Sequence, residues 1–233
     1  MTVPVDLEPA NVAAARRAFV AENIRVLDPL FTGRYSAAYR KITGAAAARV
    51  KRGDLALLSQ KMDFLGLNIY TGFFVRAGKS GRPEKIEFPA NYPRTDCVWH
   101  YLMPQVLYWG PKLVKELYGP LPLYITENGA GYNEAPPMNG EVHDLHRRDC
   151  VRHYLGQLRA ALQEGAPVKG YFLWSFMDNY EWEDGYQRRF GIVYNDFATQ
   201  RRTPKLSARW FAQVIKKKRT SLIGGPGMAR SCR

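Results

Sequence analysis

The chain has 233 residues, of which 46% are hydrophobic, so it is long enough to bury a sizeable core. Its formal net charge of +13 is either scattered over predicted helices or gathered in residues 216–233, and we expect no specific nucleic-acid partner. No run approaches the roughly eighteen apolar residues that a membrane-spanning helix needs, so we expect no membrane partner either.

The first predicted helix covers residues 9–27. It carries the following residues at helical spacing: Val12, Ala15, Phe19, Asn23 and Val26. Pro29 stands just beyond, and because proline interrupts helical hydrogen bonding we expect the helix to end before it.

A strand is predicted over residues 62–71, where Asn68 and Tyr70 share one face by the two-residue period of a strand. Any carbonyl can satisfy a buried tyrosine, so this pair alone is a weak functional signal. Residues 78–94 follow, rich in Gly, Pro and charge, and they predict an exposed loop with a short hairpin.

The next helix, residues 111–118, is stopped by Gly119 and leads into a strand over residues 123–129. That strand delivers Glu127 into a polar turn that ends in glycine. One interpretation is a carboxylate that caps the following loop. The other is an active-site acid, since catalytic carboxylates of α/β barrels lie at strand ends.

A long helix over residues 144–163 precedes a third strand, a continuous apolar and aromatic run over residues 168–176. The loop that follows, residues 177–191, interleaves aromatic side chains with carboxylates and amides. Aromatic faces stack on the C–H face of a sugar ring, while carboxylates and indole N–H groups bond its hydroxyls. Part of the aromatic set, Tyr171 and Phe172 above all, is expected to fill the core instead.

The last helix is predicted to start at Thr203 as N-cap with Pro204 as its first residue. Three strands, each followed by helical sequence and each ending in polar residues, indicate an α/β fold, a partial (β/α)8 barrel. We find no linker, so residues 1–215 are expected to form one domain. The basic residues 216–233 are expected to be a disordered tail.

Three segments resemble signatures of glycoside hydrolase family 1, the β-glucosidase and β-galactosidase family. They are residues 63–70 (Asp-Phe-Leu-Gly-Leu-Asn-Ile-Tyr), residues 124–129 (Tyr-Ile-Thr-Glu-Asn-Gly) and residues 174–191, which begin Trp-Ser-Phe-Met-Asp-Asn-Tyr-Glu-Trp. All three occur in the family's order. The resemblance implies strands six to eight of the barrel with their helices, and residues 2–6 look like the exit of strand five.

The resemblance also implies a role for each residue of a sugar site in a retaining β-glucosidase. Glu127 would be the nucleophile and Tyr70 would orient it, with Asn68 near the reacting sugar. Trp174 would be the stacking platform for the sugar ring, and Glu181 would accept from the C4 and C6 hydroxyls. Trp182 would donate to the C3 hydroxyl, and Phe190 would line the pocket. Because a carboxylate at Glu181 would repel phosphate, a neutral β-glucoside is the expected substrate.

The family's second carboxylate, the Glu of an Asn-Glu-Pro motif, has no counterpart here. The nearest look-alike is Glu134, which we expect in a surface loop and not as a substitute acid. Retaining glycosidases need both carboxylates. The chain is therefore expected either to be the nucleophile-bearing half of an enzyme, or to be a truncated, inactive fragment or weak sugar-binding half-barrel. Its open sheet edges predict a missing N-terminal half as partner, or self-association.

Cys97, Cys150 and Cys232 are odd in number and lack metal-ligand spacing, which favours a reducing compartment without disulfides. With no signal segment in view, we expect a cytoplasmic location. The histidines, His100 and three between residues 143 and 153, show no converging carboxylate. We therefore expect no metal site and no cofactor, which glycoside hydrolysis of this kind does not require.

Overall fold

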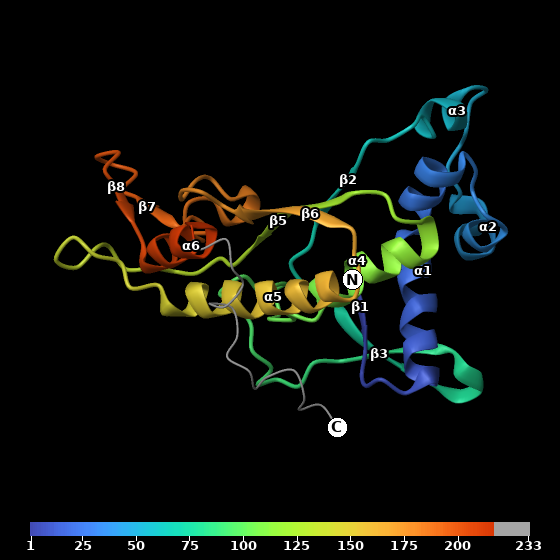
Figure 1. Ribbon diagram of the computed structural model, residues 1–233, viewed down its shortest axis with the longest axis horizontal. Coiled ribbons are helices and arrows are strands. Elements are labelled where there is room, and N and C mark those ends of the chain that lie inside the picture. Colours follow the sequence, from blue (N-terminus) through green and yellow to red (C-terminus); the bar gives the residue numbers. More distant parts are fainter. Residues whose placement is uncertain (217–233) are drawn as a thin grey trace.

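The computed structural model describes residues 1–216 and shows a partial α/β fold (Figure 1). In chain order the elements are β1 (Thr2–Pro4), α1 (Pro9–Thr32), α2 (Ala37–Thr43), α3 (Asp54–Leu58), β2 (Leu65–Asn68), β3 (Phe73–Ala77), β4 (Pro83–Ile86), α4 (Val106–Tyr118), β5 (Leu123–Gly129), α5 (Leu145–Gln163), β6 (Val168–Trp174), β7 (Val193–Asn195), β8 (Arg202–Pro204) and α6 (Leu206–Lys216). The predicted tail beyond Lys216 lies outside the described residues, and Lys216 itself is the last residue of α6.

The central sheet is parallel and has the strand order β2-β5-β6. Tyr124 of β5 pairs with Gly66 of β2 on one side and with Gly170 of β6 on the other. All three strands were predicted. β5 has the expected bounds, whereas β2 and β6 are shorter than the runs over 62–71 and 168–176, because chain pairing stops where the polar loops begin.

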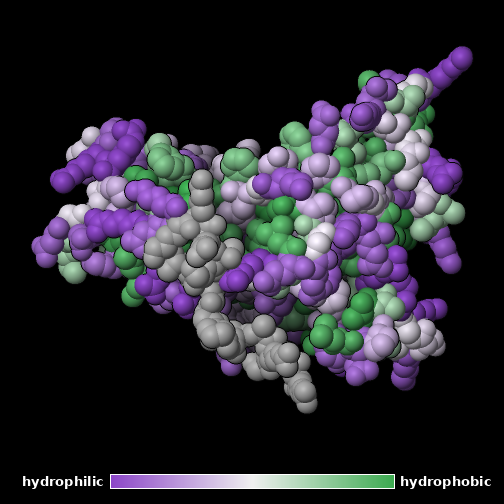
Figure 2. All heavy atoms as spheres, viewed as in Figure 1, coloured by the Kyte–Doolittle hydropathy of each residue, from purple (hydrophilic) through white to green (hydrophobic). Residues whose placement is uncertain are grey.

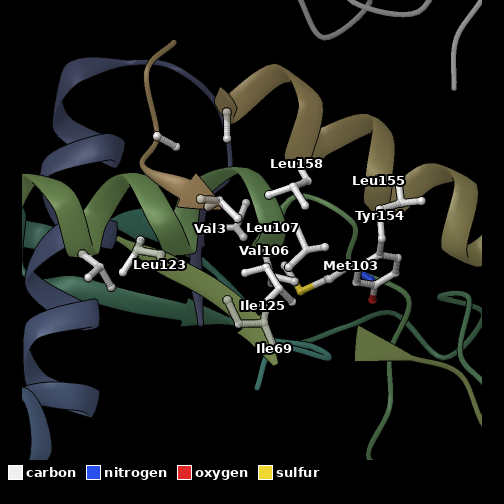
Figure 3. Close-up of a cluster of buried hydrophobic side chains, with 14 of the residues drawn as sticks. Val3, Ile69, Met103, Val106, Leu107, Leu123, Ile125, Tyr154, Leu155 and Leu158 are labelled. Carbon is white, nitrogen blue, oxygen red and sulfur yellow. The ribbon is translucent and has the colours of Figure 1, made fainter. Parts of the chain in front are cut away.

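One face of this sheet packs on helices α4 and α5. Leu123 and Ile125 alternate with more exposed residues along β5 and are fully buried. They meet side chains from both helices and from neighbouring loops, as Figure 3 shows for Val106, Leu107, Met103, Tyr154, Leu155 and Leu158. The burial of these apolar groups holds the helices against the sheet and fixes the strands that carry the polar loops.

The opposite face of the sheet is exposed within the described part of the chain. Gly66, Thr126 and Phe172 all lie open to solvent, and Phe172 is 58% exposed. The expectation that Phe172 fills the core is therefore wrong: by strand alternation it points away from the face that α5 covers. Apolar side chains also gather over the middle of the face seen in Figure 2. Exposed apolar area of this kind is typical of a surface that another layer covers.

Two helices run through prolines. Helix α1 continues past Pro29 to Thr32 and ends at Gly33, whose left-handed conformation caps it. Helix α4 starts at Val106, five residues before Pro111, and not at Pro111 as expected. Gly110 precedes Pro111, and its lack of a Cβ removes the clash that a proline imposes on the residue before it. Packing of the flanking buried residues outweighs the one hydrogen bond that each proline removes.

A hairpin replaces the predicted start of the last helix. Thr203 and Pro204 belong to β8, which pairs antiparallel with β7, and α6 begins only at Leu206. A second small sheet has the order β1-β3-β4, with β1 parallel to β3. Its β3–β4 hairpin coincides only in part with the one expected in residues 78–94, because β4 lies in that range whereas β3, which starts at Phe73, precedes it. In residues 1–216 no helix combines the length and apolarity of a membrane span.

Candidate active site

Glu127 and Tyr70 meet at the carboxyl end of the central sheet. The hydroxyl of Tyr70 donates a hydrogen bond to Oε2 of Glu127 at 3.0 Å. Burial, and after it the adjacent Glu127 carboxylate, raises the pKa of Tyr70 far above its ordinary value. The phenol therefore stays protonated and holds one oxygen of Glu127 in place.

Tyr70 is itself held from behind. The hydroxyl of Tyr154 on α5 donates to the carbonyl oxygen of Tyr70 at 2.7 Å and accepts from the backbone N–H of Met103 at 3.0 Å. The Tyr70 ring also packs edge-to-face against His100 at 5.7 Å and Phe190 at 6.2 Å. A tyrosine fixed at its backbone and on its ring offers a rigid donor to the carboxylate.

The loop after β6 brings a second carboxylate to the site. The indole Nε1 of Trp174 donates to Oε2 of Glu181 at 3.3 Å. Burial raises the pKa of Glu181, and the nearby Glu127 and Asp184 carboxylates act in the same direction. The Glu127 carboxylate thus acts electrostatically on Glu181, which the half-buried Trp174 side chain contacts.

The other predicted site residues are placed unequally. Asn68 lies opposite Glu127 in the strand register and accepts a hydrogen bond from the hydroxyl of Thr126 at 2.7 Å. Phe190 is buried and packs on Tyr70. Trp182, in contrast, is 81% exposed, so the described residues do not enclose its indole in a pocket.

Comparison with known proteins identifies the family of the chain. The sequence matches the profile described as "Glycosyl hydrolase family 1" over residues 1–220. The chain belongs to glycosyl hydrolase family 1. It is 40% identical to the β-glucosidase A of Thermotoga maritima over 82% of this chain and 42% of that protein. It is 34% identical to a 6-phospho-β-galactosidase of Streptococcus equi subsp. zooepidemicus over 92% of this chain and 52% of that protein.

Solved family 1 structures show the same fold. The family 1 β-glucosidase from Thermotoga maritima superposes with a TM-score of 0.76 and 35% sequence identity, over 92% of this chain and 48% of that one. These neighbours are (β/α)8 barrels, so the predicted fold class is confirmed at that level. The chain spans about half the length of the relatives it matches.

Several residues of this family 1 site were not assigned a role from sequence. They are His100, Asn128, Tyr154 and Tyr171, all of which lie behind the groups that face the sheet end. Asn128 gave no local signal, because alternation from the buried Leu123 and Ile125 would place it on the exposed face with Thr126, and only the register shift after Ile125 turns it inward. The tyrosines gave none either, since helix and strand patterns treat them as ordinary core residues.

His100 gives the site a pH-dependent stability. The side chain is fully buried, and neither ring nitrogen has a hydrogen-bond partner among residues 1–216. Burial lowers its pKa to about 4 from 6.5. Between these values the unfolded chain binds more protons than the folded chain, so the free energy of unfolding falls as the pH falls through this window.

We expect the chain to lose on the order of 3 kcal/mol of stability between pH 7 and pH 4 through His100 alone. Urea unfolding at several pH values measures it. His100→Leu should flatten that part of the curve, whereas the control His153→Gln, at an exposed position, should leave the slope unchanged. A wild-type slope retained in His100→Leu would assign the effect to other groups.

Glu134 lies in a loop with exposed neighbours, as expected, but its side chain points inward. Its side chain is 9% exposed and forms ion pairs with Arg147 and Lys205, both fully buried. Lys205 also pairs with Asp178 at 2.8 Å, and Arg147 with Asp144 at 2.7 Å. Both Glu134 oxygens are thus engaged by cations, and the residue joins the loop after β5 to the start of α6. Because Asp178 also pairs with Arg189, the network has three cations, and without Glu134 only two carboxylates would balance them.

Removing this carboxylate should strongly destabilise the fold. We expect Glu134→Ala to lower the free energy of unfolding by about 3 kcal/mol, because it leaves buried positive charge uncompensated. Urea denaturation measures the change. The control is Glu84→Ala, whose ion pair with Arg76 is about half exposed and should be worth under about 1 kcal/mol. Equal losses in the two variants would contradict the assignment.

Within residues 1–216, no three His, Cys, Asp or Glu side chains cluster in a way that could hold a metal ion. Cys97 and Cys150 are buried free thiols, and burial raises the pKa of Cys97 to about 11.

Proposed function

We propose that this chain is the nucleophile-bearing part of a retaining β-glucosidase, with β2, β5 and β6 as strands six, seven and eight of the barrel. The observation that carries the proposal is the hydrogen bond from Tyr70 to Glu127 at the carboxyl end of a parallel sheet, beside the Trp174–Glu181 pair. This is the edge at which barrel enzymes place their catalytic groups. The β-glucosidases among the relatives support the substrate class.

In the proposed reaction an oxygen of Glu127 attacks the anomeric carbon of the sugar. The bond from that carbon to the aglycone oxygen breaks, and its electron pair leaves with the aglycone. Tyr70 fixes the orientation of the Glu127 carboxylate, since its hydroxyl binds one carboxylate oxygen and thereby orients the second. Water then attacks the anomeric carbon of the glycosyl-enzyme, gives its proton to the general base and releases the Glu127 carboxylate, so the configuration is inverted twice and retained overall.

Protonation of the leaving oxygen needs a second carboxylate, about 5–5.5 Å from the first. This chain lacks the Asn-Glu-Pro motif, and Glu134 is committed to Arg147 and Lys205. We therefore assign the acid and base role to the part of the relatives that this chain does not span. The same part would cover the open face around Phe172 and the apolar groove between Phe176 and α6.

The sugar itself is assigned to the aromatic and acidic loop after β6. Trp174 would cover the C–H face of the ring, Glu181 would accept from the C4 and C6 hydroxyls, and Trp182 would donate to the C3 hydroxyl. Asn68 and Phe190 would complete the site. A carboxylate at Glu181 repels a phosphate on C6, which favours a neutral glucoside over the phosphorylated substrate named for the streptococcal relative.

Trapping of the covalent intermediate tests the proposal. The purified chain is incubated with a 2-fluoro β-glucoside carrying dinitrophenolate, a leaving group that departs without protonation. Peptide mass spectrometry should then find the sugar on Glu127. Labelling of Glu134 or Glu181, or no labelling at all, would overturn the assignment.

A further inference from the structure

Asn128 bridges all three strands of the central sheet. Its side chain is 1% exposed, and its amide Nδ2 donates to the carbonyl oxygen of Ile69, just past β2, at 2.8 Å. Its Oδ1 accepts a hydrogen bond from the hydroxyl of Tyr171 on β6, also at 2.8 Å. One amide on β5 thus ties the chain on both sides, and neither bond belongs to the regular backbone ladder.

The bridge lies where that ladder is irregular. The register shifts between Leu67 and Asn68 on the β2 side, and between Ile125 and Asn128 on the β6 side. Glu127 lies inside the second shift, with its carbonyl oxygen accepting from the backbone N–H of Ile69 at 2.9 Å. A strand loses ladder bonds at such a bulge, so side-chain bonds must define the backbone there.

The side of the bridge that reaches β6 is buried and neutral. Burial raises the pKa of Tyr171 far above its ordinary value, so its hydroxyl remains a donor. Leaving a partner unpaired at a buried position costs more than the bond itself contributes. The bridge therefore has one stable arrangement, in which the carbonyl of Ile69, the amide of Asn128 and the hydroxyl of Tyr171 form a chain.

We propose that Asn128 and Tyr171 are positioning residues that hold the backbone of Glu127 at a fixed distance and angle from Tyr70. This inference rests on the proposed role of Glu127 as nucleophile. Ile69 is the neighbour of Tyr70, so the bond from Asn128 to Ile69 couples the two partners of the carboxylate–phenol pair. Misplacement of a reacting group by about 1 Å can cost on the order of 10²-fold in rate.

The test compares Tyr171→Phe and Asn128→Ala with the wild type in reaction with the dinitrophenyl 2-fluoro glucoside. We expect the first-order rate constant of labelling to fall about 10-fold in each variant, while the half-saturating concentration changes by less than about 2-fold. The double variant should be little slower than either single one, because both act through one bridge. Tyr118→Phe is the matched control, since it loses a hydrogen bond to Asp28 far from the site and should label at the wild-type rate.

The possible outcomes separate this inference from the proposed function. If the wild type is not labelled on Glu127, the proposed function fails and the positioning role fails with it. If the wild type is labelled but Tyr171→Phe and Asn128→Ala react at its rate, the positioning role alone is overturned. Tyr171→Phe removes a single oxygen, so it decides the question even where Asn128→Ala does not fold.

Discussion

Glu127→Ala should lower the release of dinitrophenolate from dinitrophenyl β-glucoside by on the order of 10⁴-fold, because no other group is placed to form the glycosyl-enzyme. The reaction should return when azide is added. The small anion enters the space of the lost carboxylate, attacks the anomeric carbon and displaces the phenolate, which inverts the configuration once. The expected product is therefore the α-glucosyl azide, identified by NMR.

The control for this experiment is Glu183→Ala. Glu183 is an exposed carboxylate in the loop after β6. We expect it to retain wild-type turnover and to show no response to azide. A β-glucosyl azide from Glu127→Ala, or a loss of equal size in Glu183→Ala, would show that Glu127 does not attack the sugar.

The isolated chain should discriminate sharply between leaving groups. It should release dinitrophenolate at a measurable rate, while its turnover of cellobiose should be smaller by at least about 10²–10⁴-fold, the usual contribution of general acid catalysis. The reason is the missing second carboxylate, since a sugar alkoxide cannot depart without a proton. Initial rates with a series of aryl glucosides should rise steeply as the acidity of the phenol increases.

Efficient cleavage of cellobiose by the pure chain would contradict this expectation and require an acid among its own residues. Glu134→Gln would then be the first variant to measure, because Glu134 is the look-alike of the absent motif. Rates that do not vary with phenol acidity would instead indicate that bond cleavage is not limiting. Only efficient cleavage of cellobiose would remove the argument for a separate acid-bearing part.

The strands and the Glu127–Tyr70 pair were accessible from sequence for a local reason. A continuous apolar run followed by polar residues is a short-range pattern, and parallel strands bring their carboxyl ends to one edge whatever the loops do. The approximate places of β2, β5, β6 and α5 follow from it. The three strands form one sheet in the order β2-β5-β6, as that rule requires. Tyr70 and Glu127, which are 57 positions apart in the sequence, therefore meet at its edge.

The ends of helices were less accessible, because local propensity is a weak constraint there. Pro29 and Pro111 lie inside helices, and Thr203 and Pro204 lie in a strand although they have the sequence of a helix start. In each case the packing of buried neighbours or pairing with β7 is worth more than the local preference. Sequence periodicity does not contain these contacts.

What the sequence determined by itself is the family motif set, the three strands and the identity of the polar residues at their ends. Only the tertiary structure decided how those residues are used. Glu134 became a buried ion-pair partner of Lys205, which lies 71 positions further along the chain, and Asn128 became a bridge to Tyr171, which lies 43 positions away. Trp182 and Phe172 remained exposed because the described residues offer no second layer to cover them. Burial and hydrogen bonding between distant residues depend on which elements pack together, and that information exists only once the chain has folded.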